Sequence, residues 1–350
     1  MEDSHLLNEI LEQPEALRRV HAAYVERENP ALDEAAKVLQ RSKTIYFSGM
    51  ATSDYASWPA STLLSHNRRT NFCYDVSELL YYHLESLGPD SCMTLVSQSG
   101  NSAEIAHILE ELKGKHPIVG VYNSEDSTLA KGVDVGLPIL AGPQRACGSK
   151  TNLSSMAVLL LLAEKTLGHD LQQPGNVLLS VADEIEHGFD GWERRVAPAV
   201  DFLEDSAYTV FLGRGPARAS AMFTSCLFRE VPKVVAEGMG AAAFRHGLRE
   251  MIKPAHRVVI FAPESPSQPM LIRLAQDLVD IDIPVLIISN SNIDLHAGKK
   301  FLLIKTAPQP ELWASLVDMV PMQLAGYLLA KRYGLEPGKL IISTYVTSVE

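Results

Sequence analysis

The stretch "MTLVSQSGNSAEIAHILEELK", residues 93–113, changes its pattern twice. An apolar run ends at Ser97, a group of small polar residues follows, and apolar residues then recur at helical spacing from Ile105 to Leu112. A short apolar run predicts a buried strand, whereas apolar residues spaced three and four apart predict an amphipathic helix. The stretch therefore predicts a strand, a tight polar turn and a helix.

The same alternation continues on both sides of this stretch. Residues 1–40 have apolar residues at helical spacing, and the apolar run "NLSSMAVLLLLAEKTL" (152–167) predicts a buried helix. Strands are predicted in "TIYFSGMATSDY" (44–55), "PIVGVYN" (117–123) and "VGLPIL" (135–140). Strands that alternate with helices predict a mostly parallel sheet covered on both faces, which is a three-layer α/β/α sandwich of the flavodoxin-like kind.

The pattern restarts after about residue 170. "AYTVFLGRGPARASAMFT" (207–224) resembles "TIYFSGMATSDYASWPAS" (44–61), because each is a strand, a glycine turn and a helix of small residues. Further strands are predicted at 257–264, 284–290 and 300–307. We interpret the chain as a tandem repeat of one α/β domain. The expected parts are a helical segment at 1–35, a first domain at 36–185, and a second domain with a C-terminal tail at 186–350.

Composition limits the classes of function. The 350 residues carry a net charge of −11, which argues against a nucleic-acid-binding protein. The four cysteines, at positions 73, 92, 147 and 226, form no CxxC pair. No stretch near the N-terminus has the pattern of a signal peptide, and the apolar run at 156–163 is too short to span a bilayer. We expect a cytoplasmic protein without membrane contact, and no metal site.

The polar turns point to an anionic ligand. Parallel α/β sheets bind ligands at the carboxyl ends of their strands, where helix N-termini offer unpaired N–H groups. The turn at 97–102 places four polar side chains within six residues, and two more follow the strand that ends at Gly49. The alternative is simple helix capping. We favour a phosphate site whose candidate residues are Thr52, Ser53, Ser97, Gln98, Ser99 and Ser102.

No nucleotide motif accompanies this turn. The chain contains no GxxxxGK[ST] sequence, and "GRGPAR" (213–218) has Arg218 where the third glycine of GxGxxG would stand. Several arginines are candidate anion-binding groups, although surface solvation is the simpler interpretation of each; they are Arg214, Arg218, Arg229 and Arg245.

The second half supplies groups suited to proton transfer. "FREVPKVVAEGMGAAAFRHGLREMI" (228–252) contains Glu230, Glu237 and His246. A carboxylate and an imidazole are the groups that proton transfer next to a carbonyl requires. The simpler alternatives are a solvated carboxylate at a helix end for Glu230, and a capping or core histidine for His246.

These motifs together resemble the sugar isomerase (SIS) domain family in its tandem form. The likeness extends over nearly the whole chain to the isomerase half of the glucosamine-6-phosphate synthases. "SQSGNSAE", "LGRGP", "FREVPKVVAEG" and "FRHG" are similar to that group's "SQSGET", "LGRG", "LKEISYIHAE" and "LKHG", in the same order. "DVSELL" and the region 123–151 also run parallel to the family's elements.

The resemblance implies a role for each candidate residue. It implies that the hydroxyl and amide residues named above hold the phosphate of a sugar 6-phosphate, with Ser149 and Lys150 in a loop near the sugar. Glu230 would move a proton between sugar C1 and C2. His246 would open the sugar ring from the partner subunit, which implies a homodimer. No cofactor is implied.

This sequence also departs from the synthase pattern. A lysine of the catalytic helix is replaced by Leu227, and Tyr345 stands where the synthases carry a Schiff-base lysine near the C-terminus. We expect no glutaminase domain, so glutamine would not supply ammonia.

Three functions remain open. The first is an isomerase or deaminase that acts at C1 and C2 of a phosphosugar. The second is a deglycase for 6-phosphorylated fructosyl-amino-acid conjugates, for which the missing lysine is no obstacle. The third is a non-catalytic sugar-phosphate sensor.

Overall fold

The computed structural model describes residues 4–295 and 300–342, which form two compact units. The first, here called the β1 unit after strand β1 (Thr44–Gly49), comprises, among the described residues, Glu12–Gln144, Gly148–Ala182 and 340–342. The second, here called the β6 unit after strand β6 (Thr209–Gly213), comprises the described residues of 4–11, Arg145–Cys147 and Asp183–Lys339. The first helix and three residues of a later loop are therefore grouped with the second half of the chain.

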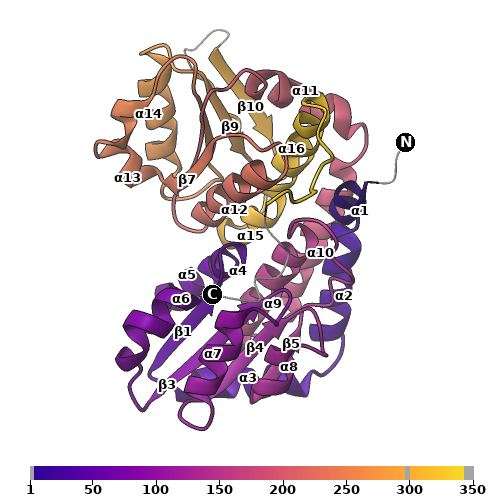
Figure 1. The fold of residues 1–350 in the computed structure, drawn as a ribbon, viewed down its shortest axis with the longest axis vertical. Helices are drawn as coiled ribbons and strands as arrows, with labels where there is room; N and C mark the ends of the chain where they lie inside the picture. The colour runs from indigo at the N-terminus through magenta and orange to yellow at the C-terminus, as the bar shows by residue number, and fades with distance from the viewer. Residues whose placement is uncertain (1–3, 296–299, 343–350) are drawn as a thin grey trace. The chain divides into compact units, whose positions relative to one another are not determined.

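The β1 unit is built on a parallel five-stranded sheet with the order β2-β1-β3-β4-β5 (Figure 1). Its strands are β1 (Thr44–Gly49), β2 (Asn71–Asp75), β3 (Ser91–Ser97), β4 (Ile118–Tyr122) and β5 (Val135–Pro138). Its helices are α2 (Gln13–Tyr24), α3 (Pro30–Arg41), α4 (Thr52–Tyr55), α5 (Trp58–His66), α6 (Val76–Glu78), α7 (Ala103–Leu112), α8 (Thr128–Gly132) and α9 (Lys150–Thr166), with the short turns η1 (Leu79–His83) and η2 (Leu84–Ser86).

The central strands β1, β3 and β4 are buried on both faces, which explains why they are rich in apolar residues. Tyr46, Met93 and Leu95 pack against α7 and α8 on one face. Helices α3, α5 and α9 pack together, and they meet the sheet at β5, β2 and β4. The sequence pattern at 93–113 is confirmed as strand, turn and helix.

The β6 unit repeats this arrangement. Its parallel sheet has the order β10-β9-β8-β6-β7. Read from the opposite edge and numbered from the first strand of each unit, this is the order of the first sheet. The strands are β6 (Thr209–Gly213), β7 (Ala236–Gly240), β8 (Arg257–Phe261), β9 (Val285–Ser289) and β10 (Phe301–Lys305). The helices are α1 (His5–Leu11), α11 (Trp192–Leu203), α12 (Ala217–Glu230), α13 (Ala241–Arg245), α14 (Gln268–Val279), α15 (Glu311–Asp318) and α16 (Val320–Arg332), with the turn η3 (Leu248–Met251); the division between the units falls within α10 (Gln172–Gly188).

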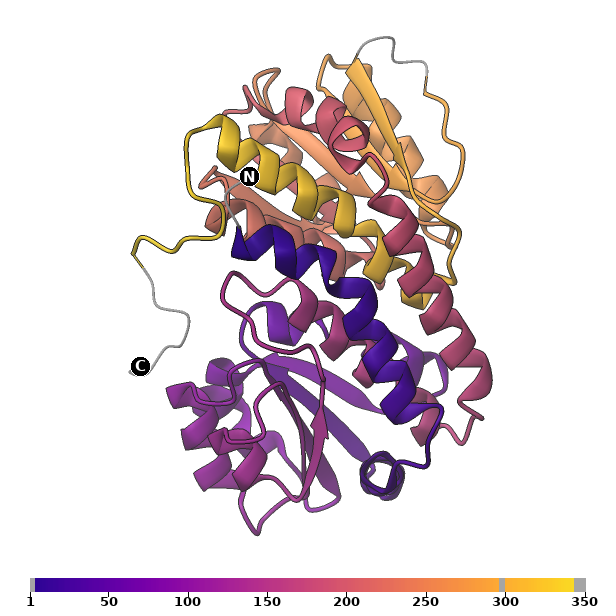
Figure 2. The same cartoon turned by 90° about the vertical axis from the view of Figure 1, so that its right-hand side faces the viewer.

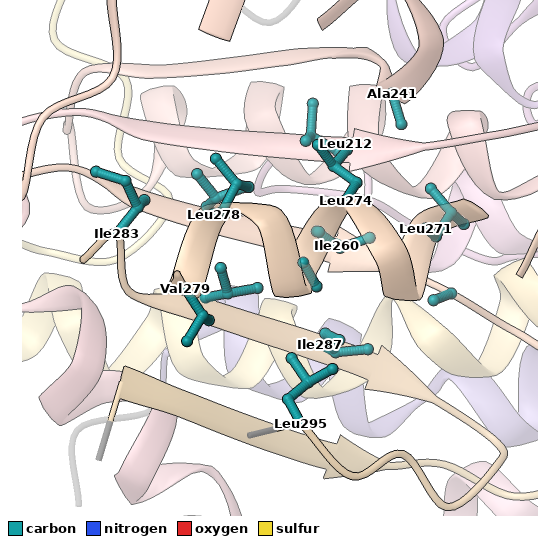
Figure 3. Packing of buried hydrophobic residues seen from close by; sticks show 14 of the residues in the cluster. Leu212, Ala241, Ile260, Leu271, Leu274, Leu278, Val279, Ile283, Ile287 and Leu295 are labelled. Atoms are coloured by element: carbon teal, nitrogen blue, oxygen red, sulfur yellow. The ribbon is translucent and has the colours of Figure 1, made fainter. Parts of the chain in front are cut away.

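The core of the β6 unit lies on both faces of its sheet. Figure 3 shows Leu212, Ile260 and Ile287 of three strands facing Leu274 and Leu278 of α14. On the opposite face α12 packs on β6 and β7, and the rings of Phe211 and Phe228 lie 4.9 Å apart. Helix α1 packs against α16 (Figure 2). The predicted fold class, two α/β sandwiches with parallel sheets, is confirmed.

The segment Glu311–Arg332 is long and apolar enough to cross a membrane by composition alone. However, 83% of its most apolar window is buried inside the protein, where the segment packs against α11, α12 and α1. The apolar character of this segment is therefore explained by its place in the core of the β6 unit.

One buried carboxyl group makes stability depend on pH. Asp318, at the end of α15, is fully buried and accepts a hydrogen bond from Oγ1 of Thr306 at 2.7 Å. Burial raises the pKa of Asp318 to about 7, although the Thr306 hydrogen bond lowers it. Because the unfolded carboxyl ionises near pH 4, the unfolded state releases a proton that the folded state keeps. Folding stability is therefore lost as the pH rises from about 4 to about 7.

Replacing Asp318 by asparagine keeps the shape and the acceptor for Thr306 but removes the titration. We compare the free energy of unfolding of Asp318→Asn with that of the unchanged protein. We expect this difference to be about 2–3 kcal/mol more in favour of the variant at pH 8 than at pH 5. Urea unfolding at the two pH values measures this difference. The exposed Asp190 offers a control in Asp190→Asn, which removes a carboxyl group without relieving a buried one. If the free energy of unfolding changed equally with pH in Asp318→Asn and in the unchanged protein, Asp318 would not be the cause of the pH dependence.

Candidate active site

The turn that follows β3, here called the serine loop (Ser97–Ser102), is held by its own polar groups. Ser97 ends β3, and its Oγ accepts a hydrogen bond from the N–H of Gly100 at 3.0 Å. Ser99 Oγ accepts from the N–H of Asn101 at 3.3 Å. Ser102 is the N-cap residue of α7, yet its side chain makes no capping hydrogen bond. Helix capping therefore does not account for the hydroxyl of Ser102.

The loop is fixed against the N-terminus of α8. Gly100 has a φ of +64°, and a Cβ on it would lie 2.4 Å from Oγ of Ser127, the N-cap residue of α8. The N–H of Leu129 donates to the carbonyl of Gly100 at 2.9 Å, and the N–H of Thr128 donates to Oδ1 of Asn101 at the same distance. Only glycine fits this position, because a side chain would meet both an unfavourable φ and a collision. The half-buried Ser97, Gln98, Ser99 and Ser102 are thereby held at the end of a rigid strand.

A second turn opens at the same edge of the sheet. Gly49, the last residue of β1, pairs with Val96 of β3, so the turn at 50–53 and the serine loop both start where these neighbouring strands end. Thr52 and Ser53 begin α4 and are half-buried. The carbonyl of Thr52 accepts a hydrogen bond from Nδ2 of Asn152 at 2.7 Å.

Ser149 and Lys150 begin α9 and are both buried. A Cβ built on Gly148 would lie 3.8 Å from Oγ1 of Thr52, so the start of α9 lies beside the turn after β1. Oγ of Ser149 has no hydrogen-bond partner among the described residues. The ammonium group of Lys150, by contrast, forms an ion pair with Glu12, whose side chain is about half exposed. Lys150 is thus paired within the β1 unit, a contact that the sequence did not predict.

Glu230 occupies the last position of α12, as the sequence predicts. Burial raises the pKa of Glu230 above its ordinary value of 4.5, whereas the positive charges of Arg229 and Lys233 lower it. Lys233 Nζ donates to the backbone carbonyl of Glu230 at 2.5 Å and to that of Lys339 at 2.8 Å. A carboxyl group whose pKa is raised by burial is suited to take up and return a proton.

Two thiols lie within electrostatic reach of Glu230. Cys147 is fully buried, and its pKa is raised first by burial and then by the charges of Glu230 and Glu9. Burial also raises the pKa of Cys226, a residue of α12, and its Sγ accepts a hydrogen bond from Arg229 at 3.3 Å. Both thiols are therefore neutral packing groups near the carboxylate. The sequence did not indicate that Cys147 and Lys233 surround Glu230.

His246 is the residue that follows α13, and it is exposed. It lines a pocket with Arg214, Ala242, Arg245 and Arg249. Among the described residues, Glu230 and His246 form no hydrogen bond with each other. Glu237 is exposed, and its carboxylate accepts a hydrogen bond from the hydroxyl of Tyr208 at 2.5 Å.

The remaining predictions have different outcomes. Tyr345 lies outside the described residues. Within residues 4–295 and 300–342, no group of three or more His, Cys, Asp or Glu side chains is placed to hold a metal ion. A larger pocket lies along β10, between Glu184, His187, Arg195 and apolar residues of α15 and α16, and it contains none of the predicted site residues.

The sequence and the fold match a known family. The SIS domain model matches the chain twice, over residues 38–165 and 202–332. The chain therefore belongs to the SIS domain family, as the sequence motifs indicated.

Individual relatives extend the match. A glutamine–fructose-6-phosphate aminotransferase (isomerizing) from Pyrobaculum aerophilum is 24% identical over 340 residues, which cover 95% of this chain and 56% of the relative. The chain thus spans about half the length of the curated relatives it matches. The C-terminal domain of glucosamine-fructose-6-phosphate aminotransferase from Francisella tularensis has a TM-score of 0.85 at 19% identity, covering 96% of this chain and 98% of that one. Glucosamine-6-phosphate deaminase from Thermotoga maritima has a TM-score of 0.78 at 18% identity, covering 99% and 100%.

Proposed function

We propose that the protein is an enzyme that moves a proton between C1 and C2 of a 6-phosphorylated ketose or amino sugar. The observation that carries this proposal is Glu230, a carboxyl group at a helix end whose pKa burial raises. In its ionised form Glu230 takes a proton from one carbon next to the carbonyl, and the electron pair of that C–H bond forms an enediol or enolamine. The protonated Glu230 then returns a proton to the neighbouring carbon.

The serine loop is assigned to the phosphate. Half-buried hydroxyl and amide groups of Ser97, Gln98, Ser99 and Ser102 lie beside the N-terminus of α7, where backbone N–H groups and the helix dipole favour an anion. Thr52 and Ser53 add donors from the neighbouring turn, and Ser149 adds a buried hydroxyl beside Thr52. Lys150, which is paired with Glu12, is assigned to the loop near the sugar. No cofactor is required for this chemistry.

The missing Schiff-base lysine favours a second candidate function. The synthases carry that lysine near the C-terminus, where this sequence has Tyr345. Leu227 of α12, where the synthases carry another lysine, is buried in the core and supplies no amine either: a Cβ on Gly326 of α16 would meet Leu227 Cδ2 at 2.8 Å. A deglycase, which splits an amino acid from a 6-phosphorylated fructosyl conjugate, needs the proton transfer by Glu230 but no Schiff-base lysine.

A panel of substrates tests these functions. Purified protein is incubated with glucosamine 6-phosphate, with fructose 6-phosphate plus ammonia, and with fructosyl-amino-acid 6-phosphates, and released ammonia, amino acid and hexose phosphate are followed. Ammonia from glucosamine 6-phosphate supports the deaminase, aldose product from fructose 6-phosphate supports the isomerase, and free amino acid supports the deglycase. Tight binding without turnover of any member would contradict an enzyme and favour a sensor.

We also propose a homodimer in which His246 opens the sugar ring of the partner's substrate. The exposed position of His246 after α13 supports this role. If it holds, mixing inactive Glu230→Gln and His246→Ala proteins after dissociation restores activity, because one site of each mixed dimer then has both residues intact. About a quarter of the sites would be intact in a random mixture. If mixed dimers form but activity is not recovered, the proposed action of His246 on the partner's substrate is contradicted.

A further inference from the structure

A compact basic pocket lies in the β6 unit at the carboxyl ends of β6 and β7. It is lined by Arg214, Ala242, Arg245, His246 and Arg249, and is here called the arginine pocket. Arg214 is the first residue after β6, whereas the other four follow β7: Ala242 and Arg245 on α13, His246 directly after it and Arg249 on η3. Because β6 and β7 are parallel neighbours, these segments meet at one edge of the sheet. The pocket has a volume of about 330 Å³, which is room for a small phosphorylated molecule.

The positive charge of this pocket is only partly balanced. Arg245 Nη2 lies 3.6 Å from Oδ2 of Asp277, and both side chains are about one-third exposed, so this pair is weak. The guanidinium of Arg214 instead meets a neutral group, since its Nη1 lies 3.2 Å from the sulfur of Met270. Arg249 pairs with no carboxylate among the described residues. An excess of two positive charges thus remains in the pocket of a chain whose net charge is −11.

The loop after β8 offers a contrast. By strand order this loop is the counterpart of the serine loop, but its polar groups bond to one another: Oγ of Ser265 and Oγ of Ser267 lie 3.2 Å apart. Gln268 Nε2 donates to the hydroxyls of Ser289 and Ser291. The same loop carries the acidic Glu264. The counterpart loop is therefore unsuited to an anion, and the positive charge of this edge is gathered in the arginine pocket.

We propose that the arginine pocket binds the dianionic phosphate group of a small phosphorylated molecule, at a site additional to the serine loop. Confined guanidinium groups repel one another, and a dianion between them relieves that repulsion. Their planar N–H groups match the geometry of phosphate oxygens. This inference rests on the charge and position of the pocket; the pocket shares His246 with the proposed ring-opening step, but its three arginines have no part in that step.

Titration calorimetry with inorganic phosphate and with glucose 6-phosphate tests the proposal. The unchanged protein is compared with Arg249→Gln and with the double variant Arg214→Gln/Arg249→Gln. The control is Arg273→Gln, which removes an equally charged and exposed side chain of α14 in the same unit. A Gly100→Ala protein, in which the serine loop is disturbed, separates the two sites.

We expect one phosphate-binding event to survive in Gly100→Ala and to weaken by about tenfold or more in Arg249→Gln, since it loses a charge-assisted hydrogen bond. The double variant should lose it, and Arg273→Gln should keep it. Equal affinity for phosphate and glucose 6-phosphate would show that the phosphate group alone is recognised, whereas tighter binding of the ester would add contacts to its sugar. Unchanged binding in the double variant, or equal weakening in Arg273→Gln, would overturn the proposal; Arg249→Gln decides alone if the double variant does not fold.

Discussion

Glu230→Gln is expected to lose turnover by about 10³-fold while its affinity for the phosphosugar stays within a few-fold of the unchanged protein. The amide has the shape of the carboxyl group but cannot take up the proton from carbon. Steady-state kinetics on the active member of the substrate panel gives kcat, and calorimetry gives the affinity. Because burial raises the pKa of Glu230, the acid limb of the pH–rate profile should lie above pH 4.5 and disappear with the carboxyl group.

The matched control for this experiment is Glu237→Gln. Glu237 lies seven positions further along the chain, but it is exposed and its carboxylate is bonded to the hydroxyl of Tyr208. We expect Glu237→Gln to keep kcat. A fully active Glu230→Gln protein would remove Glu230 from the reaction, and equal losses in the two variants would point to a general effect of charge.

Gly100→Ala is expected to weaken binding of the phosphosugar by about 10²-fold, because the serine loop must move to make room for the methyl group. The added Cβ would lie 2.4 Å from Oγ and 2.6 Å from Cβ of Ser127, in a backbone conformation with a φ of +64°. Gly100 and Asn101 of the loop accept hydrogen bonds from the N-terminus of α8. A shift of the loop away from Ser127 therefore displaces the groups that we assign to phosphate. Calorimetry with the phosphosugar measures the loss.

Gly114→Ala separates collision from backbone strain. Gly114 has a φ of +74°, but a Cβ on it would meet nothing within 4 Å. We expect this variant to lose about 1 kcal/mol of stability from the unfavourable φ and to bind the phosphosugar normally. If Gly114→Ala lost as much affinity as Gly100→Ala, loss of stability would explain both results and the assignment of the serine loop would fail.

The fold was predictable from local pattern because each strand is followed at once by its helix. The apolar run before Ser97 and the helical spacing after Ser102 are both local, and the structure places β3 and α7 there. The position of Glu230 at the end of α12 was predictable for the same reason. The sequence pattern also indicated the repeat of one α/β domain, since each half begins with a strand, a glycine turn and a helix; the strand order that the two sheets share was not predicted.

The surroundings of the site were not predictable because they depend on contacts between distant positions. Lys150 pairs with Glu12, which is 138 positions away. The charge of Glu230 helps to raise the pKa of Cys147, which lies in a separate segment of the chain. No local pattern carries such pairs. Lys233 was within reach of sequence reasoning, since it follows Glu230 by three positions, but its bond to the Glu230 carbonyl depends on a backbone turn with a φ of +58° at Lys233.

The most direct test of the central claim is exchange of carbon-bound hydrogen with solvent. The protein is incubated in D₂O with fructose 6-phosphate, glucosamine 6-phosphate and a fructosyl-amino-acid 6-phosphate, and proton NMR follows C1 and C2 of each sugar. In the isomerase, deaminase and deglycase reactions alike, Glu230 takes a proton from a sugar carbon. While it is on the carboxyl group, this proton exchanges with solvent. We predict deuterium at C1 or C2 of at least one sugar with the unchanged protein and none with Glu230→Gln. The same deuterium incorporation in Glu230→Gln as in the unchanged protein would contradict proton transfer by Glu230.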